Sequence, residues 1–429
     1  MSKQGVILVL YHAWGTFPLR DTIRSHLYCW KHYSKYRCIY INIAFGFPWW
    51  ILQRVDIVYV VYHTTLLSLR WLPTLFEHRS ALCRPLANIT VPKIAIPQDE
   101  FLHTDLLGRF LADQQITHLY TCASENDWKN IYERHLDFSK VAVKTVLTGY
   151  LDEGTVMRID AIKLQRRVRS CDIGYRAWRA ASWLGQHGQH KVRAGSVICE
   201  AAKRRGFRVD CSLREEDVLV GDDWFKFLLN CRATVGAPGG ASVLDRDGSV
   251  KASVEAYEHA HPEATFEEIR KECFPGRDGE LDLACISPRH LEACLTETCQ
   301  ILIEGNYNGV LHPWRHYIPV QPDYRDVEAA LEALADERIV DRIVKTAYED
   351  IVASKRWTYE SFVGEIERDV FGVSFEISRS SRLVSALFWA RDWFHWRLVQ
   401  LHAEVVRRKT KSQIIRLLYV WLKRVLTSR

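Results

Sequence analysis

The sequence lacks several patterns that would assign it to a familiar class. Its twelve cysteines include no Cys-x-x-Cys pair, which argues against a structural zinc site and predicts free thiols in a reducing cytosol. No Gly-x-Gly-x-x-Gly fingerprint is present, which argues against a nicotinamide-binding domain. Internal repeats and low-complexity segments are also absent. What remains is the composition of a folded globular protein, 48% apolar and 26% charged.

We expect no segment for export or membrane insertion. The first five residues lead directly into an apolar run rather than into a signal sequence. The apolar run around residues 49–62 contains Arg54 and Asp56, so it cannot form a spanning helix. We therefore expect a cytoplasmic protein.

Basic charge is concentrated at the C-terminus. The net charge is +6, yet no acidic residue follows Glu404 while eight basic residues do, so the rest of the chain carries −2. A nucleic-acid-binding body would need its own basic face, so nucleic acid is not expected as a partner. Residues 407–429 are expected to bind an anionic membrane surface peripherally, or to pack on the body of the protein or on a second copy.

Apolar runs alternate with helical patterns along most of the chain. This alternation is typical of an α/β fold with doubly wound parallel sheets. A length of 429 residues suggests two or three domains. We predict domains at residues 1–160 and 161–370, the second with an insertion at about 246–285, and a helical extension at 371–429. Strands are expected at 6–11, 37–44, 56–62, 92–96, 116–122, 141–147, 171–176 and 208–211.

The stretch from residue 286 to 324 carries the clearest functional pattern. Ser287 and Pro288 suit the first positions of a helix, whose free N–H groups attract anions. Arg289 and Glu292 fall on one face of that helix. Arg289 could hold a diphosphate while Glu292 accepts hydrogen bonds from sugar or ribose hydroxyls; alternatively, the two form a solvated pair.

The run Pro288–Ala293, followed by a strand and a Gly/Asn-rich loop, resembles the donor half of GT-B glycosyltransferases. It is most similar to the CgeB-like group, in which an Arg-x-x-Glu-Ala segment opens the donor-side helix and an Asp-x-x-x-Val segment, here Asp323 to Val327, opens the final helices. The resemblance extends loosely over about residues 5–370. It implies two Rossmann-like domains that face each other across a cleft. Ala284 stands where many retaining members carry a second glutamate, so the stereochemical outcome is left open.

The resemblance also assigns the donor diphosphate to two further cations, Arg176 and Lys191. Gly185 and Gly188 lie between them in a segment that could approach an anion closely or form an ordinary turn. Gly239 and Gly240 are expected to form a wall for a nucleotide or sugar, or a permissive turn.

On the acceptor side, proton removal suits a carboxylate or imidazole at a strand end. His63 follows one predicted strand, and Asp99 and Glu100 follow another. Alternatively, His63 is hydrogen-bonded below the edge of the sheet, and Asp99 and Glu100 cap a helix. The Asp245-x-Asp247 pattern precedes Gly248 as a turn would, and no metal is expected.

Together these patterns predict a metal-independent glycosyltransferase. It would move a sugar from a nucleotide-sugar to a glycan, lipid-linked or other surface-polysaccharide acceptor. Two alternatives stay open: a polyol-phosphate transferase with a CDP-polyol donor, and a non-catalytic membrane-associated scaffold on a degenerate transferase fold.

Overall fold

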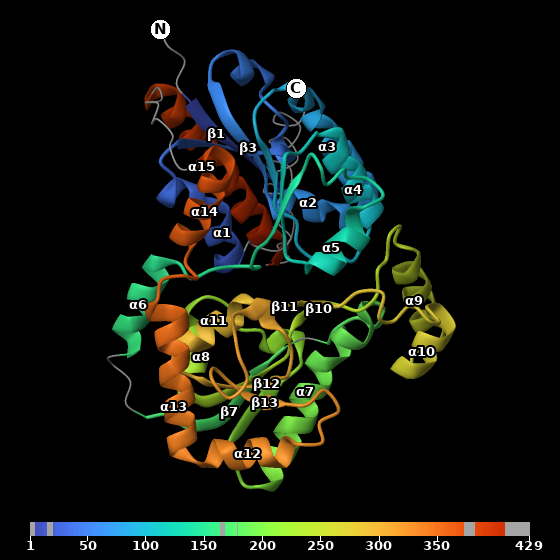
Figure 1. The fold of residues 1–429 in the computed structure, drawn as a ribbon, viewed down its shortest axis with the longest axis vertical. Helices are drawn as coiled ribbons and strands as arrows, with labels where there is room; N and C mark the ends of the chain where they lie inside the picture. Colours follow the sequence, from blue (N-terminus) through green and yellow to red (C-terminus); the bar gives the residue numbers. More distant parts are fainter. Residues whose placement is uncertain (1–4, 15–19, 164–167, 178, 373–381, 408–429) are drawn as a thin grey trace. The chain divides into compact units, whose positions relative to one another are not determined.

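The computed structural model describes residues 5–14, 20–163, 168–177, 179–372 and 382–407 (Figure 1). The chain forms two compact units, each with its own parallel sheet. Unit 1 comprises Met1–Thr121, Ile131–Thr145 and Val363–Arg429, and unit 2 comprises Cys122–Asn130 and Val146–Phe362. The predicted doubly wound α/β class is confirmed, whereas the predicted limits at 160 and 370 stay a prediction.

Unit 1 contains a six-stranded parallel sheet in the order β2-β1-β3-β4-β5-β6. The first strand is buried along its whole length, which explains its uninterrupted apolar sequence. The strand order changes direction between β1 and β3, as in doubly wound folds. The strands are β1 (Gly5–Tyr11), β2 (Arg37–Asn42), β3 (Asp56–Tyr62), β4 (Lys93–Ala95), β5 (His118–Thr121) and β6 (Ala142–Thr145).

Unit 2 contains a five-stranded parallel sheet in the order β13-β12-β9-β7-β8 and a two-stranded antiparallel sheet, β10-β11. Here the order changes direction between β7 and β9. The strands are β7 (Cys171–Arg176), β8 (Val209–Ser212), β9 (Cys231–Gly236), β10 (Gly239–Ala241), β11 (Leu283–Cys285), β12 (Cys299–Ile303) and β13 (Ile318–Val320).

Helices connect the strands of both sheets. In chain order they are α1 (Asp21–Tyr33), α2 (Thr64–Leu67), α3 (Pro73–Ser80), α4 (Thr104–Asp113), α5 (Glu125–Tyr132), α6 (Glu153–Lys163), α7 (Gly185–Arg204), α8 (Asp222–Asn230), α9 (Ser249–Ala260), α10 (Phe266–Cys273), α11 (Pro288–Leu295), α12 (Val327–Ala335), α13 (Glu337–Ala347), α14 (Tyr359–Phe371) and α15 (Arg382–Arg407). None of these described helices is both long and apolar enough to cross a bilayer.

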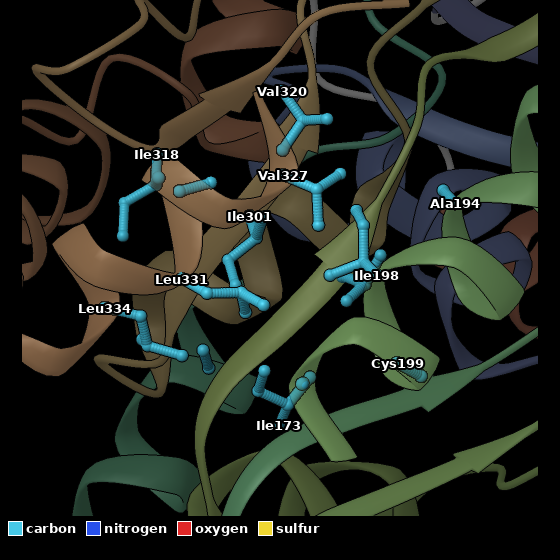
Figure 2. Packing of buried hydrophobic residues seen from close by; sticks show 14 of the residues in the cluster. Ile173, Ala194, Ile198, Cys199, Ile301, Ile318, Val320, Val327, Leu331 and Leu334 are labelled. Atoms are coloured by element: carbon cyan, nitrogen blue, oxygen red, sulfur yellow. The ribbon is translucent and has the colours of Figure 1, made fainter. Parts of the chain in front are cut away.

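Alternating strand residues divide the core of unit 2 between the two faces of its sheet. Ile301 and Ile303 of β12 join a cluster with α7, α12 and α13, while Leu302 joins another with α11 on the opposite face. Figure 2 shows the first cluster, in which Ile198 of α7 lies close to Ile301 and Val327. The sheet is therefore covered by helices on both faces.

The C-terminal helix α15 belongs to the core of unit 1. Phe388 and Val399 are buried, and Trp389 packs against Tyr40 of β2 at a centroid distance of 5.6 Å. Asp392 accepts hydrogen bonds from the hydroxyls of Tyr11, at 2.6 Å, and Tyr28, at 2.8 Å. The predicted C-terminal extension is therefore helical over residues 382–407, where it packs on unit 1. The basic segment 408–429 lies outside the described residues.

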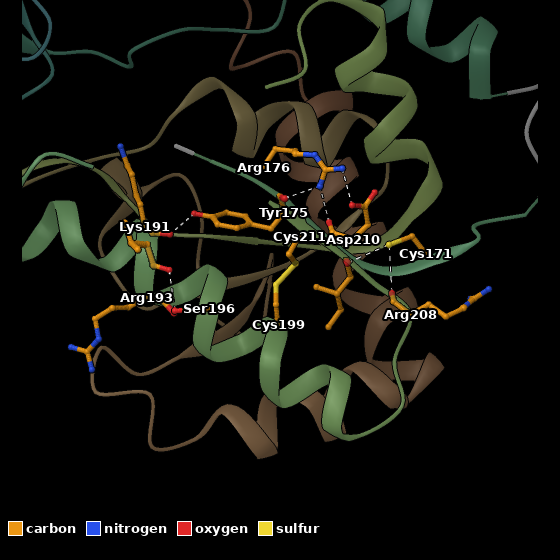
Figure 3. The surroundings of a disulfide bond; sticks show 12 residues. Cys171, Tyr175, Arg176, Lys191, Arg193, Ser196, Cys199, Arg208, Asp210 and Cys211 are labelled. Atoms are coloured by element: carbon orange, nitrogen blue, oxygen red, sulfur yellow. Dashed lines mark hydrogen bonds and ion pairs between the residues drawn. A yellow bond between two sulfur atoms is a disulfide. The ribbon is translucent and has the colours of Figure 1, made fainter. Parts of the chain in front are cut away.

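One disulfide corrects the prediction that all the thiols are free. Cys199 of α7 is bonded to Cys211 of β8, twelve positions later (Figure 3). The packing of α7 on the sheet brings their Cα atoms to 6.7 Å, and no local sequence signal indicates this pairing. The other ten cysteines carry free thiols.

Candidate functional site

A polar pocket of about 330 Å³ lies in unit 2 where β9 and β12 end. The chain leaves β9 toward Pro238 and leaves β12 toward Glu304, and both residues line the pocket. The carboxyl ends of parallel strands are where doubly wound sheets bind ligands. The lining residues are Cys122, Ser124, His187, His190, Pro238, Asp282, Ala284, Ile303, Glu304, Gly305, Asn306, Asn308 and Pro322.

The loop after β12 forms one wall and is fixed by its own hydrogen bonds. Tyr307 is fully buried and donates from its hydroxyl to the carbonyl of Ile303 at 2.7 Å. Asn308 adopts a left-handed conformation, with φ of 54°, and accepts from the backbone N–H of Ile286 at 2.7 Å. Glu304 remains exposed and accepts from the side-chain amide of Gln321. The wall therefore presents carboxylate and amide groups from a rigid backbone.

The first two turns of α7 form a second wall. The sequence suggests an anion-binding segment or an ordinary turn here, whereas the structure is helical from Gly185, whose φ is +71°. His187 and His190 both line the pocket, one helical turn apart. His187 Nε2 lies 3.2 Å from Asp282 Oδ1, and His190 Nδ1 lies 3.4 Å from the Tyr324 hydroxyl. Burial lowers the pKa of both imidazoles.

Lys191 lies on the next position of α7, beside the strand that follows Pro238. Its Nζ is 3.9 Å from where a Cβ on Gly239 would lie. Gly239 pairs with Cys285, so β10 and β11 run next to this cation. Gly240 is required for a different reason: its φ is +131°, and a Cβ there would lie 1.7 Å from the carbonyl oxygen of Leu283. The two glycines thus form a strand that closely approaches another backbone.

Helix α11 begins as the sequence predicts. Ser287 is the N-cap, Pro288 is the first helical residue, and the Ser287 N–H donates to His290 Nδ1 at 3.1 Å. His290 is buried beneath the end of β9, since its Nε2 lies 3.3 Å from where a Cβ on Gly236 would be. Burial first, and then the charges of Arg289 and Lys191, lower the pKa of His290 to about 4. Both cations are therefore close to the start of this helix.

Arg289 and Glu292 both contact Trp224, and Arg289 also contacts Arg176. Arg289 donates to the backbone carbonyl of Arg176 and lies over the Trp224 ring at 5.0 Å. Glu292 is buried, and its carboxylate accepts from Trp224 Nε1–H at 2.7 Å. Burial raises the pKa of Glu292, although Trp224 and Arg289 partly counteract this effect. The predicted pair is therefore not a solvated one, and its donor-binding role stays a prediction.

Arg176 is engaged by neighbours in unit 2. Its guanidinium donates to the backbone carbonyl of Asp210 at 2.9 Å and to the Asp210 carboxylate at 2.8 Å (Figure 3), and it lies over the Phe227 ring at 4.4 Å. Its predicted contact with a donor diphosphate therefore competes with this ion pair and stays a prediction.

The three predicted acceptor-side residues lie in unit 1 and differ in exposure. Glu100 is fully buried and accepts from the hydroxyls of Thr121 and Tyr132, each at 2.5 Å. His63 is also fully buried; its Nε2 lies 2.8 Å from His26 Nδ1, and burial and then His26 lower its pKa. Asp99 is exposed, with φ of 52°. Their catalytic roles stay predictions.

The Asp245-x-Asp247 segment lies directly before helix α9. Asp245 is buried and accepts from the backbone N–H groups of Gly248, at 2.9 Å, and Lys251, at 2.8 Å. Over the described part of the chain, no group of three or more His, Cys, Asp or Glu side chains is arranged to hold a metal ion.

Sequence reasoning missed several pocket residues. Glu304 and Asn306 could have been found, because they directly follow an apolar strand, as ligand-binding residues do in parallel sheets. Ser124 and Asp282 could not have been found in this way, because they lie in two connections that are far apart in the sequence. Their proximity depends on Asp127, which accepts from the backbone N–H of Asp282 at 2.9 Å and so joins the two segments.

No family model and no curated protein matches the chain. Solved structures are similar over most of its length. Anabaena HepE in complex with UDP-glucose aligns with 85% of this chain and 98% of its own, at 11% identity and a TM-score of 0.43. Trehalose-6-phosphate synthase OtsA aligns with 88% of this chain and all of its own, at 11% identity and a TM-score of 0.43. An alpha-glucosyltransferase in complex with UDP and DNA aligns with 86% of this chain and 99% of its own, at 10% identity and a TM-score of 0.43.

These structures are GT-B glycosyltransferases, the class that the sequence also resembles. At such TM-scores and identities the likeness assigns no role to any residue of this chain.

Proposed function

We propose that the protein is a glycosyltransferase that binds a nucleotide-sugar in unit 2 and transfers the sugar to a glycan, lipid-linked or other surface-polysaccharide acceptor. The observation that carries the proposal is the polar pocket at the ends of β9 and β12, beside the start of α11. Its carboxylates and amides, from Glu304, Asn306 and Asn308, are the groups that recognise sugar and ribose hydroxyls.

The diphosphate would lie toward the cations that surround the start of α11. The free N–H groups of this helix end favour an anion. Lys191 and Arg289 both act electrostatically on His290 at this helix end, so their charges would stabilise a leaving diphosphate as negative charge develops on it. This account needs no metal ion for the transfer.

On the acceptor side, Asp99 is the first candidate for the base because its side chain is exposed, whereas Glu100 and His63 are fully buried. The basic segment 407–429 would bring the enzyme to an anionic membrane surface that carries the acceptor. The cytoplasmic location stays a prediction.

Incubation with a panel of UDP-, GDP-, ADP- and CDP-sugars, with nucleotide release as the signal, tests the proposal. We expect release from at least one donor, and a loss of about tenfold or more in Lys191→Ala and Arg289→Ala. Arg325→Ala, which changes an exposed cation after β13, is the matched control. Failure of every donor to bind or react would contradict the proposed function.

A further inference from the structure

The side chains that line the pocket carry a net negative formal charge when both histidines are neutral. Its described lining contains two carboxylates, Asp282 and Glu304, and no lysine or arginine. Lys191 lies beside the pocket and offsets only part of this negative charge. Among the described lining residues, His187 and His190 are the groups that can become positively charged near neutral pH.

His187 has the surroundings of a group that gains a proton when an anion enters. Its Nε2 lies 3.2 Å from Asp282 Oδ1, so an imidazolium would have a carboxylate partner. Asp282 is held in place through its backbone N–H by Asp127. His187 is itself fixed, since its backbone N–H donates to Ser242 Oγ at 3.3 Å and Ser242 donates to Asp278 at 2.6 Å.

The charged groups that face His187 come from three elements. The carboxylates of Asp282 and Asp278 precede β11, and that of Asp127 lies on α5; all three raise the pKa of His187. Burial outweighs them and lowers this pKa overall, and Lys191 lowers it further. His190, on the same helix, faces Tyr324 and Arg193. The lowered pKa favours the neutral imidazole of His187, and a nearby diphosphate would shift the balance toward the imidazolium.

We propose that His187 takes up a proton when the diphosphate of a nucleotide-sugar binds, so that donor affinity depends on pH through the His187–Asp282 pair. The inference rests on the proposed function and specifies how the same site is regulated. The proton comes from solvent and is released with the nucleotide, and no covalent bond changes in this step.

The test uses the full chain and the nucleotide-sugar that binds most tightly in the panel, with UDP-glucose as the first probe. The diphosphate of a nucleotide-sugar is a diester, so the ligand itself does not titrate between pH 6 and 8. Calorimetry in two buffers of different ionisation enthalpy measures the protons taken up on binding. Between the pKa of the imidazole in the free protein and its pKa in the complex, we expect uptake approaching about one proton per ligand and an affinity that falls up to tenfold per pH unit.

His187→Gln should remove the uptake and flatten the pH dependence. Asp282→Asn should shift the uptake to lower pH; its side chain is 89% exposed, so the fold should tolerate the change. His261→Gln, an exposed histidine of the same unit, is the matched control and should leave both quantities unchanged. Binding without proton uptake, or uptake that persists in His187→Gln, overturns the inference and leaves the proposed function standing. Failure of every nucleotide-sugar to bind overturns both.

Discussion

The two units use polar residues at their strand ends in different ways. In unit 1, His63 and Glu100 follow strands but are fully buried and bonded to neighbours within the unit. In unit 2, Glu304 and Asn306 follow a strand and line a pocket. The same sequence signal, a polar residue after an apolar run, therefore marks internal hydrogen bonding in one sheet and a candidate ligand site in the other.

The largest effect should come from Arg70, which supports the buried strand ends of unit 1. Its guanidinium is fully buried and donates to the carbonyls of Leu67, Gln98, Asp99 and Leu102. Arg70→Met leaves these acceptors unpaired, and we expect a loss of about 4 kcal/mol in the free energy of unfolding. Hydrogen exchange in the peptides around β4 and α4 measures it. Unchanged hydrogen-exchange protection in these peptides would show that Arg70 does not stabilise the segment between β4 and α4.

Gly240 should have the next largest effect, now on unit 2. Gly240→Ala would place a Cβ against the Leu283 carbonyl at a positive φ, which should cost about 3 kcal/mol. Gly239→Ala is the matched control, because a Cβ there meets atoms no nearer than 3.6 Å. Denaturation in urea compares the two variants. Equal free energies of unfolding would mean that β10 and β11 lie farther apart at Gly240 than they do in the structure.

Glu292 should link stability to pH. Removing its carboxylate in Glu292→Ala leaves Trp224 Nε1–H unpaired and should cost about 2 kcal/mol. Because burial raises the pKa of Glu292, the folded state holds this proton to higher pH than the unfolded state does. Its contribution to stability therefore falls as the pH rises from the ordinary value of 4.5 through the folded pKa.

Glu292→Gln cannot titrate and should lose that part of the pH dependence. Thermal unfolding of the wild type and of this variant between pH 4 and 8 compares how the stability of each depends on pH. Identical pH profiles would show that folding does not change the pKa of Glu292, which would contradict the effect of burial.

The smallest effect on stability should come from Glu304, because it is exposed. Glu304→Ala should change the free energy of unfolding by less than about 0.5 kcal/mol, yet weaken nucleotide-sugar binding about tenfold. Glu263→Ala, an exposed carboxylate in the same unit, is the control for both measurements. A Glu304 variant that binds as well as the control would remove this residue from the site.

The fold was predictable because its signals are local. The apolar run before Tyr11 and the Ser287-Pro288 helix start act through neighbouring residues, and both elements form where predicted. The disulfide between Cys199 and Cys211 and the proximity of Ser124 to Asp282 depend on tertiary packing, which leaves no local pattern. Burial also depends on tertiary packing. Sequence alone therefore could not show that Asp99 is exposed while Glu100 is buried.

A crystal structure of the protein soaked with the best nucleotide-sugar of the panel tests the central claim most directly. The account predicts sugar or ribose hydroxyls within about 3.2 Å of Glu304 or Asn306, and the diphosphate on the side of Lys191 and Arg289. A nucleotide bound elsewhere on the chain, with the pocket at the ends of β9 and β12 left without it, would contradict the account.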